Sequence, residues 1–377
     1  MNSTLPASFP TPADLYSNRR QRLIEKMVTG GLGDAALVTS VANVRYLTGF
    51  TGDSSYLLLT PDHAVILSDG RYQVQLANEC PGVPVAIRPP SQKMNDLVQE
   101  IIGTTMPERL ILEADQVTFS QFHSLEKTLS STSLVPLDNF VTPLREIKDA
   151  YEISITRRAV EIGEAAFLEV IPTLTPQTTE REIAWKLEAA MRTRGAEGVS
   201  FEIIAAAGET GALPHYRPAD REIGDEATLL IDWGAKFLGY ASDHTRTLHR
   251  EHASDRFRDC YRAVLEAQLA AIDALRPGIK GSEVDSVARK ILVKHGLGDA
   301  FSHSLGHGIG LHIHEGPRLA AVAEDVLAEG MIVTVEPGVY FQADFGIRIE
   351  DDVLITPNGC EVLGKLPKGL DDCRLML

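Results

Sequence analysis

Apolar residues recur with two different periods along the first part of the chain, up to residue 142. Short apolar runs and stretches in which apolar and polar residues alternate predict strands. Stretches in which apolar residues recur about every 3.6 residues predict helices. The expected strands are Ala35–Thr39, Ser55–Leu59, His63–Leu67, Leu110–Leu112 and Leu134–Pro136. The expected helices are Leu15–Thr29, Tyr72–Ala77, Met94–Ile102 and Ser120–Leu129. This alternation predicts a small α/β domain over residues 16–142, preceded by a flexible Pro-, Ser- and Thr-rich arm over residues 1–15.

The second part of the chain, residues 143–377, begins with two helical patterns. The first helix buries one side at Ile153, Ile155, Ala159, Ile162 and Phe167. The second opens on the capping box Thr179–Glu182 and ends at Gly195. A shift of 101 residues places Leu174, Pro176, Glu182, Ile183 and Gly195 on Leu275, Pro277, Glu283, Val284 and Gly296. This repeat predicts an internal duplication, with two similar α/β halves that each lead to an acidic hairpin.

The first acidic hairpin lies in Thr228–Thr247. An apolar run ends at Asp232, a turn follows, and a second extended run holds Asp243. A turn centred between residues 237 and 238 places Asp232 opposite Asp243, with Cβ atoms about 5 Å apart. Two carboxylates that close beside a buried strand are costly unless a cation lies between them. The alternative is a turn in another position, with both carboxylates in water.

A second stretch, Val333–Ile355, repeats this design. With a turn near Ala343, Glu336 faces Glu350 across the hairpin, and His307 lies in a glycine-rich segment between the two hairpins. Four carboxylates and one neutral imidazole carry a charge of −4, which two divalent cations would balance. Oxygen-rich ligation with one histidine suits Mn²⁺, our first expectation, or Co²⁺, Zn²⁺ or Fe²⁺.

Composition and charge narrow the classes of function. The 377 residues are 44% hydrophobic, enough for a large buried core and two domains. The net charge of −16 argues against a general binder of nucleic acid or of anionic membranes. We expect no transmembrane helix and no secretion signal. The four cysteines show no CxxC spacing, so we expect reduced thiols in a cytoplasmic protein.

Several motifs in the second part resemble those of the pita-bread metallopeptidases. They are Asp232-x-Gly234, Ser242-Asp243-x-Thr245-Arg246-Thr247, Gly306-His307-Gly308-Ile309-Gly310, His314-Glu315-x-Pro317, Glu336-Pro337-Gly338 and Arg348-Ile349-Glu350-Asp351. The resemblance covers roughly residues 150–370 and implies a pita-bread domain with a pseudo-twofold duplication, in a chain of the mixed α/β (α+β) class. Residues 44–50 and 69–72 resemble, less specifically, the N-terminal creatinase-like domain of Xaa-Pro aminopeptidases and prolidases.

The resemblance implies a role for each site residue. Asp232 would bind one of two divalent metal ions, His307 and Glu336 would bind the other, and Asp243 and Glu350 would bridge both. A hydroxide shared by the cations would attack the peptide carbonyl. Glu336 would carry the proton to the leaving nitrogen. The outer histidines would bind substrate and stabilise the carbonyl oxygen; they are His215, His303 and His314.

Three further residues are expected near the ligands. Arg348 shares a strand face with Glu350 and would orient a ligand carboxylate, together with Tyr340. Arg318 would either grip a substrate carboxylate or form a surface salt bridge. We expect His244 and His312 to be structural or exposed. Because successive side chains of a strand point to opposite faces, His244 should lie on the face opposite Asp243.

The resemblance implies an exopeptidase that acts on peptides with proline in second position. Residues 49–53 and 69–72 favour the Xaa-Pro aminopeptidase, which cleaves longer peptides, whereas Arg318 favours the Xaa-Pro dipeptidase, or prolidase. Methionine aminopeptidase, a creatinase-like hydrolase and a non-catalytic binding module are less favoured, because the N-terminal domain and all five ligands are present. As is common in the family, we expect a homodimer.

Overall fold

The computed structural model describes residues 12–376, and the chain divides between Arg145 and Glu146 into two compact units. The first eleven residues of the expected arm lie outside the described residues. The rest of that arm is helical, because α1 begins at Pro12 rather than at Leu15. Proline is well suited to the first turn of a helix, and Asp14 in the same turn favours the positive end of the helix dipole.

The first unit is built on a six-stranded sheet with the strand order β4-β3-β2-β1-β5-β6. Strand β1 pairs antiparallel with β2 and parallel with β5, as expected for a mixed α/β domain. The strands are β1 (Ala35–Val38), β2 (Tyr56–Leu59), β3 (Ala64–Asp69), β4 (Val85–Arg88), β5 (Arg109–Glu113) and β6 (Ser133–Leu137). The helices are α1 (Pro12–Thr29), α2 (Val41–Thr48), α3 (Gln73–Glu79), α4 (Met94–Thr105), α5 (Phe119–Thr128) and α6 (Thr142–Glu146), whose last residue already belongs to the second unit.

The sequence located five of these strands and four of these helices, but not β4, α2 or α6. Helix α2 has only eight residues and ends at Gly49, which adopts a left-handed conformation with φ 82°. A helix of two turns shows too few repeats of its apolar pattern to be recognised. Strand β4 has only four residues, and its short apolar run directly follows Pro84, which argues against a strand.

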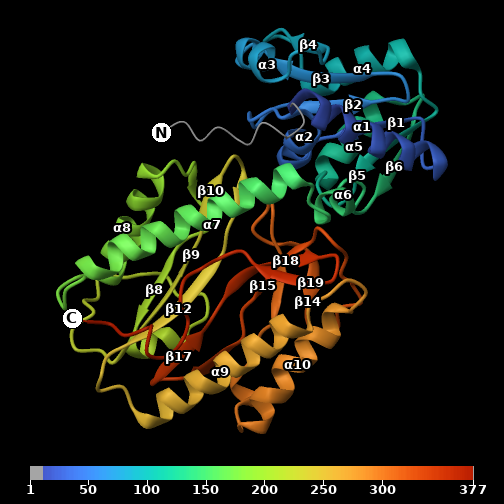
Figure 1. Ribbon diagram of the computed structural model, residues 1–377. Coiled ribbons are helices and arrows are strands. Elements are labelled where there is room, and N and C mark those ends of the chain that lie inside the picture. Colours follow the sequence, from blue (N-terminus) through green and yellow to red (C-terminus); the bar gives the residue numbers. More distant parts are fainter. Residues whose placement is uncertain (1–11, 377) are drawn as a thin grey trace. The chain divides into compact units, whose positions relative to one another are not determined.

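The second unit contains two helix pairs and several antiparallel sheets (Figure 1). Its helices are α7 (Ala150–Val170), α8 (Glu180–Thr193), α9 (Asp255–Ala274) and α10 (Gly281–Lys294), with short 3-10 turns at Ile171–Thr173, Gly208–Ala212 and Gly298–Ala300. The strands of the first half are β7 (Gly198–Val199), β8 (Ile204–Ala207), β9 (Thr228–Trp233), β10 (Ala235–Phe237), β11 (Tyr240–Ala241) and β12 (His244–His249). Those of the second half are β13 (Gly306–Gly308), β14 (Glu315–Leu319), β15 (Ile332–Val335), β16 (Gly338–Phe341), β17 (Phe345–Arg348), β18 (Asp351–Thr356) and β19 (Gly359–Val362).

The expected duplication is visible in the helices. Helices α8 and α10 both have 14 residues, and the 101-residue shift carries the first and last residue of one onto those of the other. In each half a long helix and then a 14-residue helix precede the acidic hairpin. Helices α7 and α8 lie against strands of the first half, and α9 and α10 against strands of the second (Figure 1).

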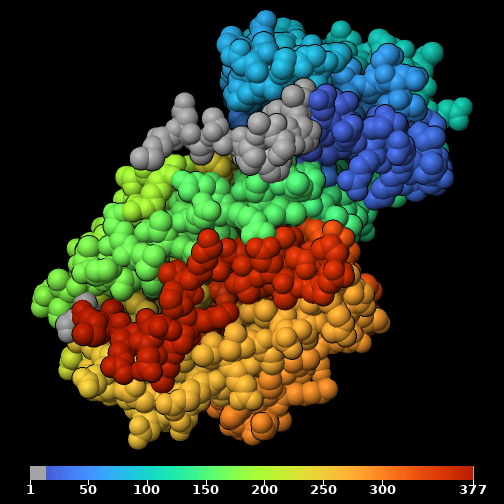
Figure 2. All heavy atoms as spheres, in the orientation of Figure 1, coloured from blue at the N-terminus to red at the C-terminus, as the bar shows by residue number. Residues whose placement is uncertain are grey.

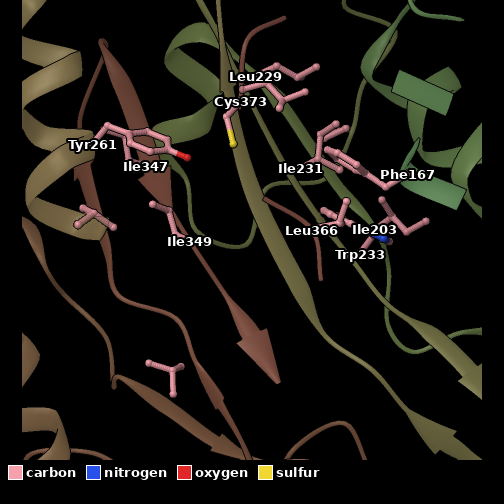
Figure 3. Packing of buried hydrophobic residues seen from close by; sticks show 14 of the residues in the cluster. Phe167, Ile203, Leu229, Ile231, Trp233, Tyr261, Ile347, Ile349, Leu366 and Cys373 are labelled. Atoms are coloured by element: carbon pink, nitrogen blue, oxygen red, sulfur yellow. The ribbon is translucent and has the colours of Figure 1, made fainter. Parts of the chain in front are cut away.

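One continuous apolar core joins the two halves of the second unit. Trp233 is fully buried at its centre and stacks on Phe167, with ring centroids 4.3 Å apart (Figure 3). The segment that follows β19 lies as a red band between the green and the gold helices in Figure 2. It is held there by Glu164 of α7, which accepts from the backbone N–H of Leu366, and by Tyr261 of α9, which donates to the carbonyl of Lys368. In residues 12–376 every helix is too short or too polar to cross a membrane.

Candidate metal centre

The register of the first acidic hairpin differs from the expected one. The turn residues are Leu238 and Gly239, both with positive φ, and Asp232 therefore pairs with Thr245 rather than with Asp243. Such two-residue turns with two positive φ angles are common in hairpins because their twist matches that of the strands. The correction is two residues, so Asp243 stays on the same strand face and becomes a diagonal neighbour. The Asp232 and Asp243 carboxyl groups remain close enough to shift each other's pKa.

The second acidic hairpin has the expected register. Val335 pairs with Asp351 and Gly338 pairs with Arg348, so Glu336 and Glu350 stand opposite each other between two ladders. The turn is centred on Ala343, as predicted, with φ 58°. The two hairpins then meet where the backbone N–H of Glu350 donates to the carbonyl of Thr245 at 3.1 Å.

The two hairpins and β13 bring the five expected ligands together. Atoms of Asp243, His307 and Glu350 that can bind a metal lie within 4.8 Å of one another. His307 Nε2 is 3.8 Å from Asp243 Oδ2 and 3.4 Å from Glu336 Oε1. Asp232 lies close enough to Asp243, Glu336 and Glu350 to raise the pKa of each. Four of these side chains come from strand ends or the breaks between ladders, where backbone geometry allows them to converge.

The electrostatics of this cluster require a positive partner. Burial raises the pKa of Asp232, Asp243 and Glu350, and raises that of Glu336 to about 8. Neighbouring carboxylates raise the pKa of Asp243 further. Oδ1 of Asp232 and Oδ1 of Asp243 are buried without a hydrogen-bond partner. Buried polar atoms of this kind nearly always have partners, and carboxylate oxygens are preferred ligands of hard divalent cations. The donor set therefore fits divalent metal ions.

His307 presents the correct nitrogen to this cluster. Its Nδ1 lies 3.0 Å from the carbonyl oxygen of Gly308, which can only accept, so Nδ1 carries the proton. Nε2 then carries a free lone pair and faces the carboxylates. Burial lowers the pKa of His307 to about 4, so the imidazole is neutral at physiological pH. A backbone carbonyl that fixes the tautomer in this way is typical of metal-binding histidines.

Arg348 makes several of the hydrogen bonds next to the ligands. Its guanidinium donates to Asp232 Oδ2 at 2.6 Å, to Tyr340 Oη at 2.8 Å and to Thr245 Oγ1 at 3.0 Å. Tyr340 then donates to His303 Nε2 at 2.9 Å, because His303 Nδ1 faces the carbonyl of Ser304 at 2.7 Å and carries the ring proton. Both nitrogens of His303 are thus engaged within the protein rather than directed to a ligand.

The other two outer histidines are exposed and lie near the cluster. The His314 ring meets the His307 ring edge to face, with centroids 4.4 Å apart. Its neighbour Glu315 is tied to the buried Lys148 at 2.9 Å. His215 lies close enough to Asp232 and His314 to influence their charge.

Arg318 lies opposite His307 in the pairing of β13 with β14. Residues paired in this way project to the same face of a sheet, so Arg318 belongs to the surroundings of the cluster. Its side chain is exposed and has no carboxylate partner within the part of the chain that the structure describes. The alternative of a surface salt bridge is therefore not observed among these residues.

Three polar side chains that hold the ligands were not predicted from the sequence. Thr245 Oγ1 donates to Glu350 Oε2 at 2.6 Å, Thr334 Oγ1 donates to Glu336 Oε1 at 3.2 Å, and Asp352 accepts from the backbone N–H of Asp243 at 3.0 Å. Thr334 stands two residues before its partner Glu336, a spacing that puts both on one face of an extended chain and that the sequence contained. Thr245 and Asp352 instead bond to ligands of the other hairpin, which the sequence does not show.

Two other histidines differ in their surroundings. His244 is fully buried and stacks on Trp233, on the side away from Asp243, and burial lowers its pKa to about 3. It is therefore a neutral core residue, in line with its expected structural role. His312 is exposed.

Comparisons with known proteins cover almost the whole chain. Residues 154–357 match the model of metallopeptidase family M24, and residues 19–147 match that of the creatinase/prolidase N-terminal domain. An Xaa-Pro dipeptidase of Pyrococcus horikoshii is 35% identical, over 95% of this chain and 99% of its own length. Among solved structures, an Xaa-Pro dipeptidase from Bacillus anthracis has a TM-score of 0.90 at 35% identity, covering 94% of this chain and 99% of its own. An X-Pro aminopeptidase from Thermotoga maritima has a TM-score of 0.86 at 36% identity, with 93% and 99% covered.

The expected creatinase-like N-terminal domain and pita-bread domain are confirmed by these matches. The acidic cluster with its single imidazole lies inside the range matched by the peptidase model. The chain belongs to metallopeptidase family M24 and is a metal-dependent peptidase.

Proposed function

We propose that this peptidase is an Xaa-Pro dipeptidase that binds two divalent cations through Asp232, Asp243, His307, Glu336 and Glu350. Residues 49–53 and 69–72 favoured the aminopeptidase. Relatives similar over nearly the whole chain are named Xaa-Pro dipeptidase, and this supports the other choice. The single observation that carries the choice is Arg318, an exposed guanidinium without a carboxylate partner among the described residues, directly across from His307.

The reaction adds water across the Xaa-Pro bond. The water oxygen bonds to the carbonyl carbon, the C–N bond breaks, and the proline nitrogen receives a proton. Bound divalent cations would lower the pKa of water and polarise the carbonyl group. Glu336, fixed by Thr334, takes the proton from water and delivers it to the nitrogen. His314 donates to the carbonyl oxygen as charge develops there, and Arg318 binds the carboxylate of the proline.

The deciding experiment compares hydrolysis of Gly-Pro and Gly-Pro-Ala by the metal-loaded protein and by Arg318→Ala. We expect Gly-Pro to be the better substrate. We expect Arg318→Ala to raise KM for Gly-Pro about 10- to 100-fold, the value of a charge-assisted hydrogen bond, with little effect on Gly-Pro-Ala. Arg276→Ala, which removes an exposed arginine at the end of α9, is the matched control. Turnover of Gly-Pro-Ala without Gly-Pro would instead support an Xaa-Pro aminopeptidase.

The identity of the metal and the assembly are part of the same proposal. Mn²⁺ remains the first candidate among the divalent ions, and a homodimer the expected assembly. Metal analysis of the purified protein tests the first expectation, and its mass in solution tests the second.

A further inference from the structure

Glu180 is a fully buried carboxylate at the first residue of α8. It accepts four hydrogen bonds, all from a single segment that covers residues 207–219. The donors are Ala207 N at 2.9 Å, Thr210 Oγ1 at 2.8 Å, Tyr216 Oη at 2.7 Å and Ala219 N at 3.4 Å. A buried carboxylate is costly unless its lone pairs are satisfied, and here the four donors and the start of a helix satisfy them.

The four donors stand on both sides of His215. Two lie before it in the chain and two after it, and Tyr216 is its immediate neighbour. The backbone of α8 adds one bond to the same segment, from Arg181 N to the Ala219 carbonyl, and one just beyond it, from Glu180 N to the Arg221 carbonyl. The loop that carries His215 is thereby attached to the start of α8, in addition to its packing on β9 and β17.

His215 itself has no hydrogen bond or ion pair with the described residues. Its exposed ring nevertheless lies near Asp232, His303 and His314, close enough to influence their charge. With no contact of its own to hold it, the ring keeps this position only as well as the loop keeps its shape. Glu180 bonds to the loop on both sides of the ring.

In the second half of the duplication, the start of the equivalent helix contacts its neighbouring segment in a different way. The 101-residue shift carries Glu180 onto Gly281, the first residue of α10. A Cβ at Gly281 would lie 2.0 Å from the carbonyl oxygen of Arg318, so the equivalent helix start touches the Arg318 segment directly through its backbone. At position 180 a carboxylate side chain adds contacts to residues 207–216, whereas at position 281 the backbone alone lies against its neighbour.

We propose that Glu180 is a positioning residue, which holds the segment 207–219 so that His215 faces the substrate carbonyl. This inference rests on the proposed function, because His215 acts on a peptide bond. Loss of Glu180 leaves the metal ligands in place but lets the His215 loop move. A displacement of about 1 Å in a group that acts on the transition state can cost about 100-fold in rate.

The experiment compares Glu180→Ala and Glu180→Gln with Glu182→Ala in the metal-loaded protein. Glu182 is a fitting control because it is exposed, lies two residues along the same helix and bonds only to the backbone N–H of Thr179. We expect Glu180→Ala to lower kcat on Gly-Pro about 10- to 100-fold with a small change in KM, since His215 acts on charge that develops in the transition state. Glu180→Gln keeps two acceptor bonds and should recover most of the loss, and Glu182→Ala should match the parent protein.

Two further readouts separate positioning from general stability. In a His215→Ala background, Glu180→Ala should change kcat less than about twofold, because the two residues act as one unit. Amide hydrogen exchange should become faster in residues 207–219 of Glu180→Ala but not in residues 303–314, and the metal content should stay at the parent level. An unchanged kcat, an undiminished effect in the His215→Ala background, or loss of metal would each overturn the inference. If the parent protein cleaves no Xaa-Pro peptide, the proposed function fails, and the exchange measurement still decides whether Glu180 holds the loop.

Discussion

A histidine can bind a metal only through a nitrogen that carries no proton, and His307 is held in that state by its own backbone. The Gly308 carbonyl accepts the hydrogen bond from Nδ1, and the unprotonated Nε2 faces Asp243 and Glu336. The glycine is needed as well, because a Cβ at position 308 would lie 1.9 Å from the carbonyl oxygen of Gly316. The ligand and its backbone support therefore form one unit of adjacent residues.

We expect His307→Ala to lower metal affinity by more than the 10- to 100-fold that is typical for the loss of a residue behind a ligand. The physical reason is the loss of the only nitrogen in an otherwise oxygen-rich set. Competition with a chelator followed by metal analysis measures the effect. His312→Ala, in the same segment but exposed, serves as the control. Equal metal retention by both variants would contradict the assignment of His307.

At the level of residues, the sequence predicts which side chains converge but not all of their contacts. The expected partners of Glu336 were correct because the turn at Ala343 has one plausible centre. The expected partner of Asp232 was wrong because Leu238, not only Gly239, takes a positive φ, and leucine gives no warning of this. The contact of Thr245 with Glu350 joins residues more than one hundred positions apart, so no local pattern could reveal it.

At the level of elements, the two hairpins are locked together behind the ligands by Arg246. Its buried guanidinium donates to Asp351 at 2.7 Å, to the carbonyl of Glu350 at 2.7 Å and to the carbonyl of Thr245 at 2.9 Å. It also reaches the C-terminal segment at the carbonyls of Leu366 and Pro367. One side chain thus connects three parts of the chain that are distant in sequence.

We expect Arg246→Ala to lower the free energy of unfolding by about 3–5 kcal/mol, because it leaves the buried Asp351 without its main partner. Tryptophan fluorescence during chemical unfolding is a suitable measurement, since both tryptophans, Trp185 and Trp233, belong to the second unit. Lys280→Ala removes an exposed ion pair with Glu324 and should leave the midpoint of unfolding unchanged. A similar midpoint for both variants would show that Arg246 does not join the hairpins.

Helix α10 offers a test of how an element places Arg318. The Cβ of Gly281→Ala would meet the Arg318 carbonyl at 2.0 Å, which forces the helix and β14 apart. We expect KM for Gly-Pro to rise several-fold with the metal content unchanged, as steady-state kinetics can show. Ser282→Ala, the next residue of the same helix, is the control. If the glycine variant has a normal KM, the contact does not set the position of Arg318.

The elements themselves show where sequence patterns are informative. Helices α7 and α8 could be predicted because each has at least 14 residues and a repeated apolar face, and α10 because it repeats the pattern of α8; α9 was not predicted. The duplication could be predicted because helix ends carry the same glycine and proline signals in both halves. Short elements such as α2 and β4 depend on their neighbours for stability, so their own residues say little about them.

At the level of the whole molecule, the cluster stores negative charge that only cations or protons can balance. In the metal-free protein, burial raises the pKa of Asp243 and Glu350, and raises that of Glu336 to about 8, above the values near 4 expected in an unfolded chain. The folded state then binds protons that the unfolded state releases. The stabilisation that these carboxyl groups contribute is therefore fully present below about pH 4 and is lost as the pH rises toward 8.

We therefore expect removal of metal by a chelator to lower the melting temperature, and to lower it more at pH 8 than at pH 5. Cations replace the protons in the loaded protein, and their binding strengthens as the ligands lose protons. Paired thermal melts of loaded and chelated protein at several pH values measure this difference. A difference that stays constant with pH would mean that the carboxylates are not what the cations neutralise.

The ligand set is divided along the chain in an uneven way. Asp232 and Asp243 precede α9, whereas His307, Glu336 and Glu350 follow it, and the exposed residues Glu251 and His252 lie between the two groups. A backbone cut at this point would give one fragment with two donors and another with three. Neither fragment alone completes the site, so recovery of bound cation after mixing would report that the severed pieces had reassembled. The peptidase could thus be divided into a split reporter, in which the amount of bound cation measures reassembly of the two fragments.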